Sequence, residues 1–209
     1  MAGMGKRMRP HTLTVPKPLI PIAGKPIVQR LVEEISFVAN EKIEEIAYII
    51  GDFGKEVEDK LINIAKKLGA KGTIYYQNEA LGTAHAIYCA EKSLSGQTIV
   101  AFADTLFKAD FKITDDIEAS IWVQKVEDPS AFGVVKIDKN NFISDFVEKP
   151  KEFVSDLAII GIYYFKEAEI LKAELKKLID NKTMVNGEYQ LTDALENMKN
   201  SGIKFTPTK

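Results

Sequence analysis

The sequence predicts an α/β fold: a Rossmann-like, mostly parallel sheet with helices on both faces, joined to a mixed or antiparallel lobe. In the first half of the chain, amphipathic helical patterns alternate with short apolar runs, as in a parallel sheet covered on both faces. After about residue 116, consecutive strand patterns separated by turn residues replace this alternation. We therefore expect one domain over residues 1–209, with a first half over residues 1–115 and a second half over residues 116–209.

The elements of the first half follow from the spacing of apolar residues. Apolar side chains recur every three or four positions in segments that begin after Pro26 or end at Gly69, which predicts helices. Short continuous apolar runs between these segments predict buried strands. We expect helices over 27–38, 55–68 and 83–93, and strands over 46–50, 73–77 and 98–102.

The second half begins with strand patterns and returns to helices. The Lys139-Asn140-Asn141 turn predicts that the strands on either side of it pair as a hairpin. We expect strands over 119–126, 133–137, 143–147, 157–165 and 203–205, and helices over 168–178 and 191–199.

Composition restricts the classes of protein. The chain has 209 residues, of which 45% are hydrophobic, so it can bury a sizeable core. Its net charge of −2 gives no basic surplus, so we expect no nucleic-acid partner. No apolar run approaches the ~20 residues of a membrane span, and we expect no membrane contact. The single Cys89 allows no internal disulfide, which favours a cytoplasmic location.

A glycine-containing segment near residue 1 carries the strongest chemical signal. It reads Ala2-Gly3-Met4-Gly5, followed by Arg7 and, further on, by Lys17. Glycines let backbone N–H groups approach a bulky anion, and the two cations add a planar fork and a compact point charge. The segment therefore suits a polyphosphate, although a surface loop with solvated cations is the simpler interpretation of the glycines alone.

Two familiar phosphate-binding motifs do not fit this segment. A Walker A loop requires Ser or Thr after its lysine, whereas Arg7 follows Lys6. A dinucleotide-binding fingerprint requires a third glycine at position 8, which is Met8. A Rossmann oxidoreductase is therefore a weak alternative.

The whole run Gly3-x-Gly5-x-Arg7-x-x-Pro10, with Pro16-Lys17 and Lys25-Pro26, resembles the signature of the sugar-1-phosphate nucleotidylyltransferases. Among these it is most similar to the glucose-1-phosphate thymidylyltransferases. The resemblance implies that Arg7 and Lys17 act in catalysis. Nucleotide binding is implied for a set of loop residues: Ala2, Gly3, Met4, Gly5, Gln77, Gly82 and Thr83. Of these, Gln77, Gly82 and Thr83 belong to Tyr76–Ala84, which looks like the nucleobase loop of the family.

The resemblance continues through the rest of the chain. Ala103-Asp104 is similar to the family's Gly-Asp pair, which implies that Asp104 holds Mg2+. The motifs 130–135, 146–150 and 187–193 look like the sugar side, which implies sugar-phosphate-binding roles for Gly133, Glu148, Lys149 and Glu188. Ile159 stands where many members carry Asn.

The implied activity joins a nucleoside triphosphate to a sugar 1-phosphate and releases pyrophosphate. The resemblance favours dTTP with glucose 1-phosphate, and UTP or GTP with other sugar phosphates stays open, as does a homo-oligomer. The main alternative is a non-catalytic regulatory or binding subunit. In the main interpretation, residues 1–115 bind the nucleotide and residues 116–209 bind the sugar.

Two pieces of the family pattern have no counterpart in these residues. A strand should lead into the Gly3 loop, where only Met1 precedes Ala2, and a Trp-x-Asp-x-Gly segment with a second metal aspartate should follow Phe205. We expect the natural protein to contain residues before Met1 and after Lys209, and the 209-residue form alone to turn over poorly.

Overall fold

A computed structural model describes residues 16–108 and 112–209 of the chain, so the predicted loop residues Ala2 to Arg7 lie outside the described residues. The chain forms two compact units. The first runs to Ala80 and adds Phe102–Thr114, and the second combines Leu81–Ala101 with Asp115–Lys209. The division into a nucleotide-binding part, residues 1–115, and a sugar-binding part, residues 116–209, stays a prediction.

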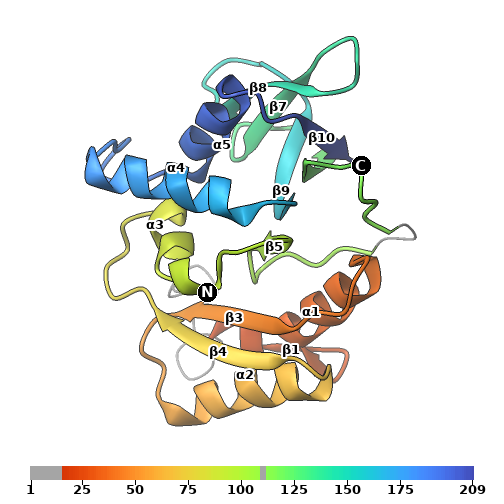
Figure 1. Cartoon of the computed structure of the whole chain (residues 1–209), viewed down its shortest axis with the longest axis vertical. Helices are drawn as coiled ribbons and strands as arrows, with labels where there is room; N and C mark the ends of the chain where they lie inside the picture. Colours follow the sequence, from red (N-terminus) through yellow and green to blue (C-terminus); the bar gives the residue numbers. More distant parts are fainter. Residues whose placement is uncertain (1–15, 109–111) are drawn as a thin grey trace. The chain divides into compact units, whose positions relative to one another are not determined.

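The first unit is built on a parallel strand pair covered by a helix. Strands β3 and β4 pair in parallel from Glu45↔Lys71 to Ile50↔Tyr76, and α2 lies along them (Figure 1). The elements are η2 (Lys17–Leu19), β1 (Pro21–Ile22), β2 (Lys25–Pro26), α1 (Ile27–Val38), β3 (Glu45–Ile50), α2 (Lys55–Lys67) and β4 (Lys71–Tyr76). Among the described residues, β3 and β4 pair only with each other.

The core of the first unit follows the predicted apolar faces. One cluster joins the buried residues of α1, α2 and the strands with Leu19: Val28, Val32, Tyr48, Ile50, Leu61, Ile64 and Ala65. Helix α2 packs closely on β4 because Gly72 has no side chain; a Cβ there would lie 3.0 Å from Ile62 Cα. The helices predicted over 27–38 and 55–68 therefore contribute apolar residues to this core.

The second unit is a mixed sheet arranged around one central strand. Its order is β10-β6-β9-β7-β8, and β5 also pairs with β9. The strands are β5 (Thr98–Ala101), β6 (Ala119–Lys125), β7 (Gly133–Ile137), β8 (Ile143–Glu148), β9 (Leu157–Phe165) and β10 (Phe205–Thr208). Only β10 and β6 pair in parallel within this sheet, as the described residues define it. The mixed lobe is therefore confirmed.

Helices cover part of this sheet. Figure 1 shows α4 and α5 next to each other, with α3 beside α4. The helical elements are α3 (Thr83–Tyr88), η3 (Glu91–Ser93), α4 (Ala168–Asp180) and α5 (Leu191–Asn200). None of the helices among the described residues is both long and apolar enough to span a lipid bilayer.

The α/β class is confirmed, and three details differ from the sequence-based expectation. Strand β5 pairs antiparallel with β9, not in parallel with β3 or β4. The helix expected over 83–93 divides into α3 and the short η3. The last strand begins at Phe205 because Ile203 closes the end of α5: its N–H donates to Met198 O at 3.2 Å, with Gly202 at φ +103°.

Two helix N-termini of the second unit hold each other through the segments 81–84 and 189–191, which we call the Gly82 clasp. Tyr189 N–H donates to Leu81 O at 2.8 Å, and Ala84 N–H donates to Tyr189 O at 3.0 Å. Gly82 has φ +99°, and a Cβ on it would lie 2.4 Å from Tyr189 O. Glycine is therefore required here both for its backbone conformation and for the close approach of the Tyr189 backbone.

We expect Gly82→Ala to destabilise the protein much more than Gly96→Ala. Gly96 also has a positive φ, +58°, but nothing lies within 4 Å of a Cβ there, so alanine adds only backbone strain of about 1–2 kcal/mol. Gly82→Ala adds a collision with backbone atoms, and we expect a loss of about 3 kcal/mol or more. Urea unfolding of both variants measures the difference, and equal losses would show that the close approach to Tyr189 is unimportant.

Candidate functional site

In the first unit, the structure joins two of the predicted site residues. Lys17 begins η2, and Asp104 lies in the turn that follows β5, where Thr105 N–H donates to Phe102 O at 3.1 Å. Lys17 Nζ lies 2.8 Å from Asp104 Oδ2. The two side chains are 30% and 53% exposed, so the pair contributes little to stability and stays accessible to a ligand.

The backbone before Asp104 accommodates Ala103, where the resembling family has glycine. Ala103 is buried, and its φ is not positive. The turn therefore needs no glycine in this chain.

The Asp104 site suits a metal ion that arrives with phosphates. No group of three or more His, Cys, Asp or Glu side chains that could hold a metal occurs within residues 16–108 and 112–209. Mg2+ in proteins is commonly bound by one or two carboxylates together with substrate phosphates and waters. A single accessible carboxylate such as Asp104 fits that mode, whereas it does not fit a metal held by the protein alone.

The predicted nucleobase loop divides between the two units. Gln77 follows β4 in the first unit; it is 8% exposed, and its N–H donates to Ile50 O at 2.8 Å. Gly82 and Thr83 belong to the second unit, where Leu191 N–H donates to Thr83 Oγ1 at 3.0 Å. The nucleotide-binding roles of all three residues stay predictions.

In the second unit, Gly133 and Glu148 lie side by side. They are register partners in the β7–β8 hairpin, and a Cβ on Gly133 would lie 3.0 Å from Glu148 Oε2. The same position is 3.4 Å from Ile159 Cδ1 and 3.6 Å from Thr192 Cγ2. Side chains from three segments of the chain thus surround Gly133. Because glycine has no side chain, its backbone lies next to the carboxylate oxygen of Glu148.

Lys149 is held in an unusual backbone conformation. Its φ is +41°, its N–H donates to Phe132 O at 3.1 Å, and its Nζ lies 3.3 Å from Glu148 Oε1. Left-handed backbone is costly for a residue with a side chain and tends to occur at functional sites. This strain supports the predicted binding role of Lys149, whose side chain is 61% exposed.

Glu188 is exposed and lies on a short bridged segment. Its backbone exchanges hydrogen bonds with Val185, at 2.9 and 3.1 Å, and Gln190 Nε2 donates to its Oε2 at 3.2 Å. The next residue, Tyr189, is part of the Gly82 clasp. The backbone around Glu188 is therefore fixed on both sides.

Two polar residues at the start of α5 were not singled out from the sequence. Thr192 Oγ1 and Asp193 Oδ2 are buried, and neither has a hydrogen-bond partner among the described residues. Burial, and then the negative charge of Glu148, raise the pKa of Asp193. Burial, followed by the same charge, also raises the pKa of Tyr163. From the sequence, Asp193 resembles an ordinary helix N-terminal carboxylate.

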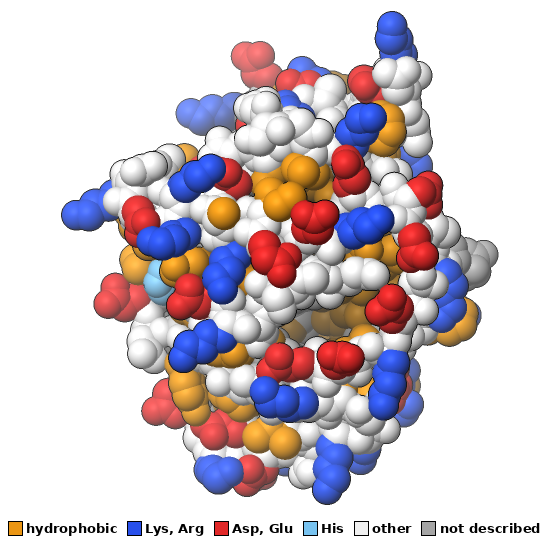
Figure 2. All heavy atoms as spheres, in the orientation of Figure 1, with side chains coloured by type: hydrophobic (Ala, Val, Ile, Leu, Met, Phe, Trp, Pro, Cys, Tyr) orange, Lys and Arg blue, Asp and Glu red, His pale blue; other side chains and the backbone are white. Residues whose placement is uncertain are grey.

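Charges of both signs are distributed over the visible surface. Figure 2 shows acidic and basic side chains interspersed over this face. This agrees with the near-neutral net charge of −2. The face in view therefore presents mixed charges.

The chain belongs to the nucleotidyl transferase family, because the model of that family matches residues 1–206. It is 33% identical to the bifunctional protein GlmU of Methanococcus aeolicus, over 97% of this chain and 47% of the relative. It is 31% identical to the low-salt glycan biosynthesis nucleotidyltransferase Agl11 of Haloferax volcanii, over 96% of this chain and 56% of the relative. It is 34% identical to the mannose-1-phosphate guanylyltransferase catalytic subunit beta of Drosophila melanogaster, over 84% and 49%. The chain thus spans about half the length of the curated relatives it matches.

Solved structures agree with this assignment. A putative glucose-1-phosphate thymidylyltransferase from Bacillus anthracis matches with a TM-score of 0.82 and 25% identity, over 99% of this chain and 83% of that one. A UDP-glucose pyrophosphorylase in complex with UDP-glucose matches with a TM-score of 0.76 and 26% identity, over 100% and 88%. The resemblance inferred from the motifs is therefore confirmed at the level of the family.

We expect Asp193→Asn to stabilise the protein at pH 7. The raised pKa means that the folded state binds the proton more tightly than the unfolded state, whose aspartate has a pKa of about 3.9. Stability therefore falls as pH rises from that value through the folded pKa, and the loss persists at pH 7. The neutral amide removes it, so the Tm of the variant should exceed that of the wild type at pH 7 and approach it near pH 4.

Asp128→Asn is the matched control for this experiment. The N–H of Ser130 donates to Asp128 Oδ1 at 3.0 Å and lowers the pKa of that carboxyl. The stabilisation is present above the unfolded pKa, so this variant should have a lower Tm than the wild type at pH 7. A lower Tm for Asp193→Asn at pH 7 would contradict the assignment, since it would mean that the charged form is favoured.

We expect Lys149→Gly to be more stable than Lys149→Ala. Both lose the ammonium group, but only glycine adopts φ +41° without strain, so the two variants should differ by about 1 kcal/mol in free energy of unfolding. Denaturant unfolding measures this difference. Equal stabilities would argue against a left-handed conformation at residue 149 in solution.

Proposed function

We propose that this chain transfers a nucleoside monophosphate from a nucleoside triphosphate to a sugar 1-phosphate, with release of pyrophosphate. The observation that carries the proposal is the contact of Lys17 Nζ with Asp104 Oδ2 at 2.8 Å. It joins a cation and a metal-binding type of anion, 87 residues apart, at an accessible position of the first unit. Family membership and the sugar-side motifs support the same reaction.

The proposed step is an in-line displacement at phosphorus. A phosphate oxygen of the sugar 1-phosphate forms a bond to the α-phosphorus, and the bond from that phosphorus to the bridging oxygen of the β-phosphate breaks. Pyrophosphate leaves with the electron pair of that bond. The attacking phosphate is already an anion, so no general base is needed, and catalysis consists of positioning and charge neutralisation.

The residues of the first unit neutralise charge. Lys17 places its ammonium group at the α-phosphate, and Arg7, outside the described residues, binds the departing pyrophosphate. Asp104 is the ligand for Mg2+, which when bound supplies Lewis-acid stabilisation of the phosphate oxygens. Ala2, Gly3, Met4 and Gly5 cradle the triphosphate with backbone N–H groups.

The residues of the second unit bind the sugar phosphate. Glu148 and Glu188 accept hydrogen bonds from sugar hydroxyls, and Lys149 contacts the phosphate as a point charge. Gly133 lets the sugar approach its backbone beside Glu148 Oε2. Gln77, in the first unit, reads the base edge with its amide, while Gly82 and Thr83 border the base with their backbone.

For substrates we propose dTTP and glucose 1-phosphate, with UTP or GTP as competing nucleotides. The structural match with a putative glucose-1-phosphate thymidylyltransferase supports the first choice. The matches with a UDP-glucose pyrophosphorylase and a mannose-1-phosphate guanylyltransferase are the reason to test UTP and GTP as well. The apolar Ile159 next to Gly133 favours a sugar that needs no polar partner there. The lone Cys89 is in keeping with a cytoplasmic location.

The experiment measures pyrophosphate released from each of dTTP, UTP and GTP with glucose, mannose and N-acetylglucosamine 1-phosphates. We expect release with one pair above all others, and only when Mg2+ or Mn2+ is present. Binding of nucleotide without release from any pair would favour the non-catalytic subunit. Full release in excess EDTA would contradict the role of Asp104.

We expect Lys17→Ala and Asp104→Asn each to lower kcat by roughly a hundredfold or more, because each removes charge at the reacting phosphates. Their free energies of unfolding should change by less than about 1 kcal/mol, since the pair is accessible. Lys60→Ala and Glu56→Gln, which break an exposed pair of 2.7 Å in the same unit, are the controls and should leave kcat unchanged. Unchanged turnover of Lys17→Ala would exclude this lysine from the reaction.

A further inference from the structure

The hydroxyl of Thr83 caps a helix other than its own. Helix α5 begins at Leu191, and its N-cap residue Gln190 makes no side-chain capping bond. Leu191 N–H, one of the N-terminal donors that a helix cannot satisfy internally, instead donates to Thr83 Oγ1 at 3.0 Å. Thr83 itself is the first residue of α3.

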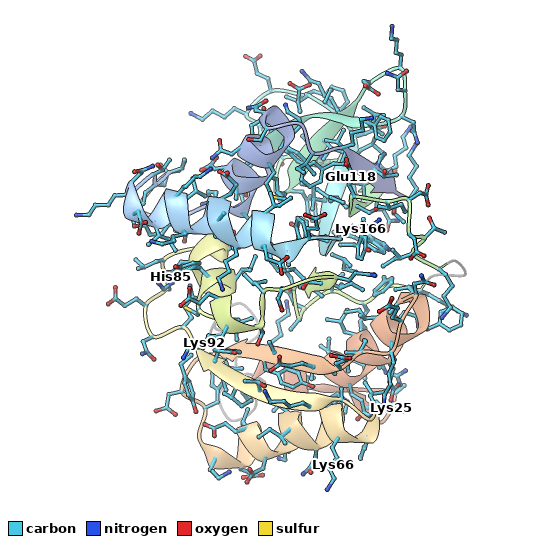
Figure 3. The ribbon with its side chains drawn as sticks, viewed as in Figure 1. Lys25, Lys66, His85, Lys92, Glu118 and Lys166 are labelled. Carbon is cyan, nitrogen blue, oxygen red and sulfur yellow. The ribbon has the colours of Figure 1, made fainter. Side chains whose placement is uncertain are left out.

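The capping is reciprocal. The N-cap of α3 is Gly82, which has no side chain to offer, and Ala84 N–H donates to Tyr189 O at 3.0 Å. Each helix N-terminus therefore satisfies a donor of the other. The His85 ring, on α3 (Figure 3), also stacks on the Tyr189 ring with centroids 6.3 Å apart.

The capped segment carries the sugar-side residues. Glu188 directly precedes Tyr189, and Thr192 directly follows Leu191 and places its Cγ2 3.6 Å from a Cβ position on Gly133. A shift of the α5 N-terminus would therefore move Glu188 and change the surroundings of Gly133 and Glu148 Oε2 together.

We propose that Thr83 is a positioning residue for the sugar phosphate, which acts by holding the segment Glu188–Thr192 through the Leu191 amide. This inference rests on the proposed function. The loop Tyr76–Ala84, which resembles a nucleobase loop, then has a second role. Thr83, the first residue of α3, holds the segment that contains Glu188, the proposed acceptor for sugar hydroxyls. Sugar-phosphate binding, more than nucleotide binding, should therefore depend on the Thr83 hydroxyl.

The test compares Thr83→Val, which keeps the shape and removes the hydroxyl, with Thr83→Ser, which keeps the hydroxyl. For Thr83→Val we expect the KM for the sugar 1-phosphate to rise about fivefold, as the loss of one neutral hydrogen bond implies. The Kd for nucleoside triphosphate, from titration calorimetry, should stay within about twofold. Thr83→Ser should restore the KM, and Leu191 N–H should exchange with solvent faster in Thr83→Val only.

Gly202→Ala is the control for lost stability. Gly202 ends the same helix, α5, with φ +103° and with nothing within 4 Å of a Cβ, so alanine destabilises the far end of α5 by backbone strain alone. It should lower the Tm and leave the KM for the sugar 1-phosphate unchanged. A rise in KM equal to that of Thr83→Val would mean that general loosening of α5 explains the effect, and would overturn the proposal.

The outcomes separate this inference from the proposed function. A wild-type protein that releases no pyrophosphate with any substrate pair overturns the proposed function, and the inference with it. An active wild type in which Thr83→Val weakens triphosphate binding and leaves the sugar KM unchanged overturns the inference alone. In that case the Thr83 hydroxyl would contact the base.

Discussion

The central strand β9 is the constraint on which the second unit depends. Its nine residues, Leu157–Phe165, are apolar or aromatic apart from Gly161, and most are buried. A buried strand must pair its N–H and C=O groups on both sides, and β9 does so with β5, β6 and β7. Through β7 it fixes the hairpin that ends at Glu148, and it also pairs directly with β5. One apolar segment thus organises the strands that carry Gly133 and Glu148, the residues proposed to bind the sugar.

Local patterns were sufficient to predict most of the elements. Helix α1 and strands β7 and β9 have the bounds that apolar spacing and flanking turn residues predict. The short β1 and β2, at Pro21 and Pro26, were not predicted because proline and two-residue strands leave no periodicity. The pairing of β5 with β9 could not be predicted either, since a four-residue apolar run carries no information about the direction of its partner.

For the site, too, short motifs could be predicted from the sequence, whereas contacts between residues far apart in the sequence could not. The type of chemistry could be predicted from the sequence because each candidate, such as Lys17, Asp104 or Glu148, lies in a short motif, and the roles of these residues stay predictions. The contact between Lys17 and Asp104, and that between Leu191 and Thr83, join residues 87 and 108 positions apart, so only the folded chain brings them together. The burial of Asp193 likewise depends on the packing of α5 and has no signature in the residues around it.

The division of the chain has a consequence for the order in which the protein is made. The segment Leu81–Ala101 belongs to the second unit but lies in the sequence between two stretches of the first unit. Its partners in the fold, β9 and Leu191, are synthesised much later. At ~5–20 residues per second, the 108 positions between Thr83 and Leu191 take a ribosome roughly 5–20 seconds. Until β9 has been synthesised, β5 lacks its pairing partner, and until Tyr189 has been synthesised, the start of α3 lacks its acceptor. We therefore expect the segment Leu81–Ala101 to become protected from proteolysis only after the residues near Leu191 have been synthesised.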